Sequence, residues 1–237
     1  MRHFPLNILS STTLSQKSTN SSNILCHFEK ALQLRNMAIA AGLDCPKYLL
    51  APEIQLLLTM LSDFRQLMLI KTLWNTGARI NEALALTKGN FYLEGDKPFV
   101  VLRTLKQRKR TAGRPREGEI IKRAVPLFDP LYVHDLQTYF TSFKLKRDTL
   151  LWNMSSANTA RNWINQAVAQ ARTQGHVFFE GISCHTFRHS FAMHLLFHRI
   201  PLKVIQAYLG HERSSSTEIY TRIFTLDIVE EHPIHFL

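Results

Sequence analysis

Two adjacent apolar segments, EIQLLLTMLS and FRQLMLIKTLWNTG, constrain the fold of this chain more than any other feature of its sequence. Their apolar residues recur at the spacing of a helix. Pro52 stands where a helix can begin, and Gly77 stands where the second helix can end. The two segments therefore predict successive helices that are strongly apolar.

The remainder of the chain adds one small sheet to further helices. Three segments rich in β-branched and aromatic residues predict strands, FYLEG, PFVVLRTLK and IIKRAVPL, with a basic loop containing Gly and Pro between the last two. Further helices are predicted for ARINEALAL, for LYVHDLQTYFTSF after Asp129, from Ser155 or Ser156 to Gly175, and for SCHTFRHSFAMHLL, PLKVIQAYL and TLDIVEEH. The expected fold class is mainly α with a small three-stranded antiparallel sheet (α+β).

The N-terminal part differs in composition from the rest of the chain. Residues 1–23 are rich in Ser, Thr and Asn and have neither an acidic residue nor an apolar period, which predicts a disordered arm. From Ile24 to Leu43 the apolar residues fall near helical spacing, and Gly42 can end that helix. Residues 24–46 are therefore expected to add one helix, and residues 47–237 to form a single domain.

The chain carries a large positive charge. Its 29 Lys and Arg against 18 Asp and Glu give a formal charge of +11 over 237 residues, which favours nucleic acid as a partner before an anionic membrane. Nine of the basic residues, with only two Glu, lie between Arg103 and Arg123. This segment is either an ordinary solvated face or a surface for a polyanion.

The cysteines and the apolar runs indicate a compartment. Cys26, Cys45 and Cys184 lie far apart without paired spacing, which argues against both a disulfide framework and a zinc ribbon. No apolar run has the length needed to span a bilayer, and the first residues lack the apolar stretch of a signal peptide. We therefore expect a cytoplasmic protein without a membrane partner.

His185, Arg188 and His189 lie within five positions on what is expected to be one helix face. Two histidines four apart can bind a metal, but the fixed charge of Arg188 opposes a second cation, and the glutamate of a hydrolytic zinc helix is absent. An arginine fork beside an imidazole suits a phosphate better. The pattern favours a phosphate site and no metal, and His194 and His198 are expected to be ordinary helix residues.

Two other segments can complete a phosphate site. Arg79 lies at the start of a predicted helix, with Glu82 placed to orient its guanidinium, although an exposed Arg–Glu pair is the alternative. Gly210 permits a reversal that would hold His211 at a turn, and Tyr220 follows nine residues later. By itself such a tyrosine is more often a packing residue.

Together, TGARINEAL, HTFRH, LGH and STEIYTR closely resemble the signature of the tyrosine recombinase (phage integrase) family in order, intervals and flanking residues. The resemblance runs from about Tyr48 to the C-terminus and implies the fold of that family's catalytic domain over residues 47–237. Residues 24–46 would then be a remnant of the N-terminal DNA-binding helical region. The implied catalytic residues are Arg79, Lys106, His185, Arg188, His211 and the nucleophile Tyr220.

The resemblance implies cleavage and rejoining of DNA through a 3′-phosphotyrosyl intermediate. Tyr220 would attack the phosphodiester, and Arg79 and Arg188 would bind the charge on its non-bridging oxygens. A free tyrosine has a pKa of about 10, so about one in a thousand is phenolate at pH 7 and the nucleophile needs a base. Because one diester is exchanged for another, neither a metal nor any other cofactor is implied.

The remaining implied roles concern protons. Lys106 on the β-hairpin would be the general acid for the departing 5′ oxygen, with Lys109 as the alternative. His185 would accept the proton of the nucleophile, and His211 would donate to the phosphate. These assignments come from the resemblance and from the chemistry of the residue types.

The implied substrate is double-stranded DNA with inverted-repeat sites. We expect a homotetramer on synapsed DNA, an accessory DNA-bending protein as a further partner, a nucleoid-associated location, and contacts from Arg108, Lys109 and Arg110 to the DNA backbone. The resemblance implies a role in multimer resolution, inversion or integration. The alternatives are a type IB topoisomerase-like enzyme and a catalytically inactive DNA-binding regulator.

Overall fold

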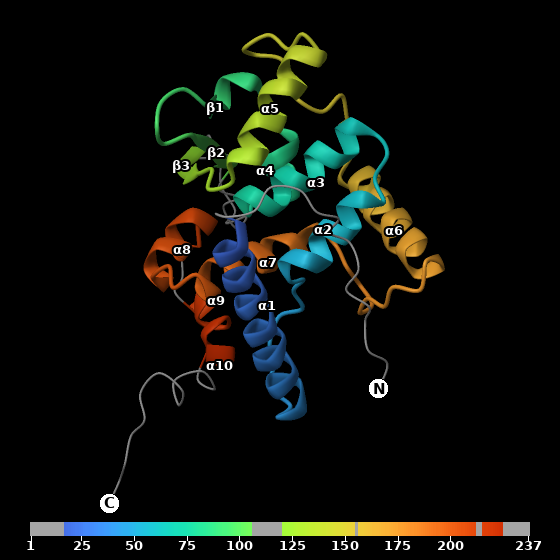
Figure 1. Ribbon diagram of the computed structural model, residues 1–237. Coiled ribbons are helices and arrows are strands. Elements are labelled where there is room, and N and C mark those ends of the chain that lie inside the picture. The colour runs from blue at the N-terminus through green and yellow to red at the C-terminus, as the bar shows by residue number, and fades with distance from the viewer. Residues whose placement is uncertain (1–16, 106–119, 155, 212–214, 225–237) are drawn as a thin grey trace, which may run out of the picture.

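The computed structural model describes residues 17–105, 120–154, 156–211 and 215–224 (Figure 1). A three-stranded sheet lies at one side of a largely helical body, which confirms the predicted fold class. The larger helices are α1 (Lys17–Ala40), α2 (Ala51–Thr59), α3 (Phe64–Thr76), α5 (Pro130–Ser142), α6 (Ala157–Thr173), α7 (Cys184–Phe197) and α8 (Leu202–Leu209). The short helices are α4 (Ile80–Leu84), the 3-10 turn η1 (Lys88–Asn90), α9 (Ser215–Glu218) and α10 (Thr221–Phe224).

Helices α3 and α7 pack against each other at the centre of the core. The Asp63 side chain caps α3 by accepting from two backbone N–H groups, and Gly77 ends it with a φ of 59° in the left-handed region. A Cβ built on Gly77 would lie 2.4 Å from Cδ1 of Phe191, so α7 can approach only because this residue has no side chain. The predicted helix end at Gly77 is confirmed, and the residue also sets the α3–α7 packing.

The sheet is antiparallel and three-stranded, as predicted, and its strand order is β1 (Phe91–Tyr92), β2 (Phe99–Leu105) and β3 (Ile120–Pro126). Leu102 lies opposite Arg123 in the register of β2 and β3. Leu102 and Val125 are fully buried, so the face of β3 that carries Arg123 and Val125 points into the protein. This placement brings an arginine into the core.

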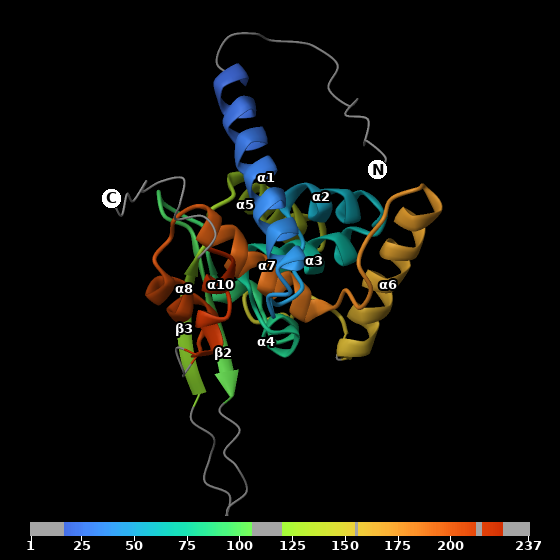
Figure 2. The ribbon, with the colours of Figure 1, turned by 90° about the horizontal axis from the view of Figure 1, so that it is seen from below.

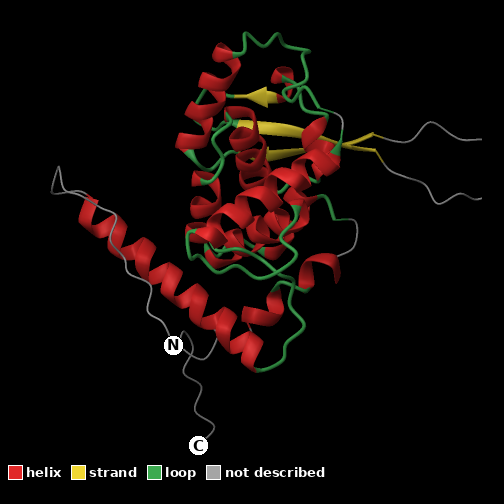
Figure 3. Ribbon diagram, turned by 90° about the vertical axis from the view of Figure 1, so that its right-hand side faces the viewer, coloured by secondary structure: helices red, strands yellow, loops and turns green. Residues whose placement is uncertain are grey.

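Helix α1 begins earlier than the sequence indicates. It starts at Lys17, so residues 17–23, which the composition predicts to be part of a disordered arm, are helical. No Gly or Pro interrupts the chain between Lys17 and Ala40, and nothing in this segment therefore forces a later start. Figures 2 and 3 show α1 extending away from the body, to which its C-terminal half is joined by a two-fold hydrogen bond from Arg35 to Glu53.

The C-terminal part of the described chain contains two single-turn helices that the sequence did not predict, α9 and α10. Helix α9 packs against α8, and α10 packs against α1. The predicted helix TLDIVEEH and residues 1–16 lie outside the described residues. None of the helices within the described ranges is both long and apolar enough to cross a membrane.

Candidate active site

Arg188 of α7 is the most deeply buried charged group of the site, with 2% of its surface exposed. Its Nη1 donates to the Gly77 carbonyl at 2.6 Å, and its Nη2 donates to the Leu209 carbonyl at 2.5 Å. Burial, together with the positive charges of Arg79 and Arg123, lowers the pKa of Arg188 to about 9. One guanidinium thus joins the ends of α3 and α8 and remains charged at neutral pH.

Arg79 precedes α4 and keeps its side chain partly open to solvent, with 37% exposed. Its Nη1 contacts Oε1 of Glu82 at 3.1 Å, and its backbone N–H donates to Oε2 of the same carboxylate at 2.8 Å. The expected contact between Arg79 and Glu82 is therefore present. The carboxylate orients a guanidinium that can still receive a ligand from solvent.

Glu82 also binds an arginine that sequence reasoning missed. Arg123 of β3 donates through Nη2 to Oε2 of Glu82 at 2.6 Å, through Nη1 to Oε1 at 3.0 Å, and through Nε to the Tyr208 carbonyl at 2.7 Å. Burial favours the neutral acid, but the hydrogen bond and charge of Arg123 outweigh it and lower the pKa of Glu82 to about 2. The Thr104 hydroxyl donates to the same carboxylate.

The carbonyls at the end of α8 connect the two buried arginines. Arg123 binds the carbonyl of Tyr208 and Arg188 binds that of Leu209, so adjacent peptide groups hold both side chains. The sequence did contain a signal for Arg123, because it shares strand parity with the apolar Val125 and a charge on an inward face requires a partner. The identity of that partner depends on tertiary structure.

His211 follows Gly210, whose φ of 63° in the left-handed region ends α8 as predicted. The Nδ1 of His211 lies 2.8 Å from the Oγ1 of Thr217, a fully buried residue. Burial, together with the positive charges of Arg188, Arg79 and others, lowers the pKa of His211 to about 4. The imidazole is therefore neutral and fixed in orientation by a hydroxyl.

Tyr220 lies between α9 and α10 with 1% of its surface exposed. Its hydroxyl oxygen is 2.8 Å from Nδ1 of His189 on α7. Burial raises the pKa of Tyr220 to about 12, against the opposing effect of the positive charge of Arg188. The phenol is thus protonated in this structure and lies within electrostatic reach of the buried guanidinium.

His185 lies one turn before His189 on the same face of α7 and is exposed to solvent. The centroids of the two rings are 5.5 Å apart. Partial burial and the charges of Arg188 and Arg79 lower the pKa of His185. The sequence placed His185 and His189 on one face but did not indicate that the second ring is the one in contact with Tyr220.

The structure therefore brings five predicted residues into one neighbourhood from four segments of the chain: Arg79, His185, Arg188, His211 and Tyr220. The remaining predicted residues, Lys106, Arg108, Lys109 and Arg110, lie outside the described residues. In the part of the chain that the structure describes, no three His, Cys, Asp or Glu residues are grouped to hold a metal ion. A concentration of guanidinium and neutral imidazole groups is suited to an anion.

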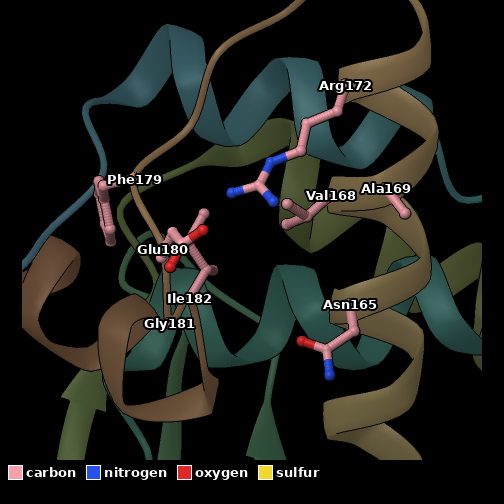
Figure 4. A pocket seen from close by; sticks show the side chains of 8 residues that line it. All are labelled: Asn165, Val168, Ala169, Arg172, Phe179, Glu180, Gly181 and Ile182. Atoms are coloured by element: carbon pink, nitrogen blue, oxygen red, sulfur yellow. The ribbon is translucent and has the colours of Figure 1, made fainter.

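A separate hollow of about 480 Å³ lies between α6 and the segment that leads into α7 (Figure 4). Arg172 and Asn165 of α6 line one side, and Glu180 lies on the other. The Nη2 of Arg172 donates to the Phe178 carbonyl at 3.3 Å. None of the predicted site residues lines this hollow.

The sequence of this chain is similar to those of a known protein family. A sequence model described as the phage integrase family matches residues 47–226. Two Escherichia coli proteins named resolvase are 46% identical over 224 residues, which cover 88% of this chain and 85% and 83% of theirs. Another Escherichia coli protein, named probable site-specific recombinase in afa region, is 44% identical over 209 residues, covering 88% of this chain and 83% of its own.

Solved structures share the fold. A XerH site-specific recombinase bound to difH substrate matches with a TM-score of 0.58 and 24% identity over 78% of this chain and 53% of its own. The catalytic domain of bacteriophage HP1 integrase matches with a TM-score of 0.52 and 21% identity over 78% of this chain and 94% of its own. The chain spans about half the length of the XerH chain, and the shared part has the catalytic-domain fold.

Proposed function

Because this chain belongs to the phage integrase family, the tyrosine recombinases that cut and rejoin DNA, we propose that it forms a 3′-phosphotyrosyl link through Tyr220. The observation that carries the proposal is the position of the Tyr220 hydroxyl, which lies 2.8 Å from Nδ1 of His189 on the helix that carries Arg188, close enough for the charge of Arg188 to lower the pKa of the phenol against the effect of burial. A packing tyrosine needs no such neighbour. A nucleophile for a phosphodiester does.

The two arginines of the resemblance serve as the phosphate-binding groups. A guanidinium has five N–H donors, and Arg188 uses two N–H groups on the carbonyls of Gly77 and Leu209, which leaves others for a ligand. Arg79 is partly exposed and oriented by Glu82. Together they bind the charge that gathers on the non-bridging oxygens, where loss of one donor typically costs about 3 kcal/mol of transition-state stabilisation.

The chemistry is an exchange of diesters. Tyr220 attacks the phosphorus, the 5′ oxygen departs, and a second strand's 5′ hydroxyl later reverses the link. Lys106 is proposed as the general acid for the departing oxygen, and Lys109 is the neighbouring alternative. His211, neutral and fixed by Thr217, donates a hydrogen bond to the phosphate. The bond energy is kept in the phosphotyrosyl ester, so the reaction needs no cofactor.

The biological substrate is double-stranded DNA with inverted-repeat sites, synapsed by a homotetramer. The names of the two relatives at 46% identity favour resolution as the role, ahead of inversion or integration. Arg108, Lys109 and Arg110 are proposed to contact the DNA backbone, and an accessory DNA-bending protein is proposed as a further partner. A nucleoid-associated place in the cytoplasm follows from this substrate.

Covalent trapping tests the function. Nicked duplexes that tile the DNA on both sides of the gene are incubated with the protein, and denaturing gels report a protein–DNA adduct. We expect the wild type to form an adduct at inverted-repeat sites and Tyr220→Phe to form none. If neither protein forms an adduct on any duplex yet both bind DNA, the inactive-regulator alternative is correct.

A second assay separates recombination from topoisomerase activity. Supercoiled plasmids with no site, one site and two sites are incubated with the protein. We expect exchange products only with two sites. Relaxation of the plasmid that has no site, without exchange products from the others, would instead assign a type IB topoisomerase-like activity.

A further inference from the structure

The contact between Tyr220 and α7 assigns a role to a residue outside the six that the family resemblance implies. We propose that His189 accepts the hydroxyl proton of Tyr220 during cleavage and returns it during rejoining. The proposal rests on the proposed function, because it concerns the nucleophile of that reaction. It replaces His185 in the role of proton acceptor.

The geometry is that of a base in contact with its acid. Nδ1 of His189 is 2.8 Å from the hydroxyl oxygen of Tyr220, within the range for direct proton transfer. The ring centroids lie 5.8 Å apart at 58°, so the two rings are not stacked and the contact is made edge-on through the polar atoms. Tyr220 is 1% exposed, which keeps bulk water from competing for its hydroxyl.

His185 is less suited to this role. It lies one helical turn away, its ring centroid is 5.5 Å from that of His189, and it is exposed to solvent. Within the described residues, the Tyr220 hydroxyl makes its hydrogen bond to His189. The two histidines share a helix face, so the choice between them depends on the path of the segment that carries Tyr220.

The charged and titratable groups around His189 determine its protonation state. His185 and Arg188 face it from α7, Tyr220 from the segment between α9 and α10, and His211 from the turn after α8. Burial, then the charges of His185 and Arg188, lower the pKa of His189 to about 4. The ring is neutral at pH 7 and its free electron pair is available to a phenol.

Bound DNA would increase the basicity of this ring. A phosphodiester carries one negative charge, and its binding to Arg188 offsets the positive charge that disfavours an imidazolium at His189. The base is thus weak while the site is empty and stronger when the substrate is present. This order protects the nucleophile from unproductive ionisation.

The proposed step balances in atoms and charge. The Oη–phosphorus bond forms as the phosphorus–O5′ bond breaks, and the proton of the Tyr220 hydroxyl passes to Nδ1 of His189. The departing O5′ takes its proton from the proposed general acid Lys106. Rejoining runs the same transfers in reverse, with His189 as the acid that protonates the departing phenolate.

The test measures single-turnover cleavage of a nicked duplex by His189→Asn, which keeps a hydrogen-bond acceptor but cannot be protonated near pH 7. His198→Asn, at the exposed end of the same helix, is the matched control. We expect the first variant to cleave at least about 100-fold more slowly and the second at the wild-type rate. DNA binding and thermal unfolding of both variants show whether the fold is retained.

A substrate with sulfur in place of the bridging O5′ separates the two proton transfers. Its thiol leaving group has a pKa of about 8.5 and departs without an acid. We expect it to restore cleavage in Lys106→Ala but not in His189→Asn. Restoration in His189→Asn would overturn the proposal, because the residue would then act on the leaving group.

The pH profile distinguishes a proton acceptor from a residue that only positions the tyrosine. Wild-type cleavage should slow at low pH as His189 becomes protonated, and this acidic limb should disappear in His189→Asn. A uniform loss at every pH, or an acidic limb that disappears in His185→Asn instead, would refute the assignment. Because the wild type forms an adduct in each of these outcomes, they leave the proposed function intact.

Discussion

Arg188 and Tyr220 are both almost fully buried, yet the elements that hold them differ greatly in length and packing. Arg188 lies in the 14-residue helix α7, which packs on α3, and its guanidinium is held by two backbone carbonyls. Tyr220 lies between two four-residue helices. Arg188 is thus held by a long helix and two backbone carbonyls, whereas Tyr220, although its side chain belongs to the hydrophobic core, lies on a segment of two single-turn helices.

This difference suits a reaction that has two states of the nucleophile. Under the proposed function, the phosphate is bound in one fixed geometry, whereas Tyr220 is free in one state and joined to DNA in the other. A segment of two single-turn helices can change position at a lower cost in free energy than a long helix. Helix α7, which packs on α3 in the core, cannot move without disrupting many close-packed side chains.

The largest effect is expected from Arg188→Lys. A lysine cannot bind both the Gly77 and the Leu209 carbonyls in the geometry of a guanidinium. We expect the free energy of unfolding to fall by about 3 kcal/mol and the rate of DNA cleavage to fall by about 100- to 1000-fold. Chemical denaturation and adduct trapping measure the two losses.

Two control variants sharpen this comparison. Tyr220→Phe removes one hydrogen bond, so it should abolish the adduct while costing about 1 kcal/mol of stability or less. Arg172→Lys, at an exposed arginine that donates to one carbonyl, should change neither quantity by much. Equal stability losses in Arg188→Lys and Tyr220→Phe would contradict the proposed division of the site.

Glu82→Gln should destabilise the fold by about 3 kcal/mol, because it leaves Arg123 buried without its carboxylate. The folded-state pKa of Glu82, about 2, lies below its ordinary value of 4.5. Its contribution to stability is therefore complete above pH 4.5 and is lost as the pH falls towards 2. Urea unfolding at several pH values should show this acid limb in the wild type and its loss in the variant.

The control for that prediction is Glu53→Gln. Glu53 also pairs with an arginine, Arg35, but both side chains are partly exposed, at 26% and 18%. Solvent screens such a pair, so the loss should be smaller, about 1 kcal/mol or less. An equal loss in the two variants would show that burial does not set the strength of the Glu82–Arg123 pair.

Gly77→Ala is expected to cost about 2 kcal/mol, since the added methyl group meets Phe191 and the backbone is left-handed. Gly42→Ala has a similar φ, 65°, but nothing within 4 Å of the added Cβ. Gly42→Ala should therefore lower the free energy of unfolding only by the cost of a left-handed backbone at alanine, about 1 kcal/mol. Thermal unfolding of both variants separates the backbone from the packing contribution at Gly77.

The sequence predicted those parts of the fold that are determined locally. Gly77 and Gly210 end helices, and Asp129 caps α5, because each position depends on its own backbone conformation or on a neighbouring N–H group. The predicted start of α1 was wrong because Ser- and Asn-rich sequence disfavours a helix only weakly. Composition alone did not reveal that residues 17–23 continue the turn of α1.

The site was predictable as a set of residue types and not as a set of contacts. The motifs identified Arg79, Arg188 and Tyr220, whose assigned catalytic roles stay predictions. They did not assign a partner to Arg123 or to His189, because each contacts an atom contributed by a distant segment, Glu82 Oε2 at a separation of 41 positions and Tyr220 Oη at 31. Sequence spacing does not encode such pairings.

The smallest effect is expected at Arg222, which joins the segment that carries Tyr220 to Asp44. Nη1 of Arg222 donates to the Asp44 backbone carbonyl at 2.9 Å, and its side chain is half exposed. Arg222→Ala should therefore change stability by less than about 0.5 kcal/mol, yet slow cleavage several-fold by loosening the segment that carries Tyr220. Asp44→Asn keeps the carbonyl and should cleave at the wild-type rate. If instead Asp44→Asn slows cleavage as much as Arg222→Ala, the carboxylate holds the segment and the backbone contact does not.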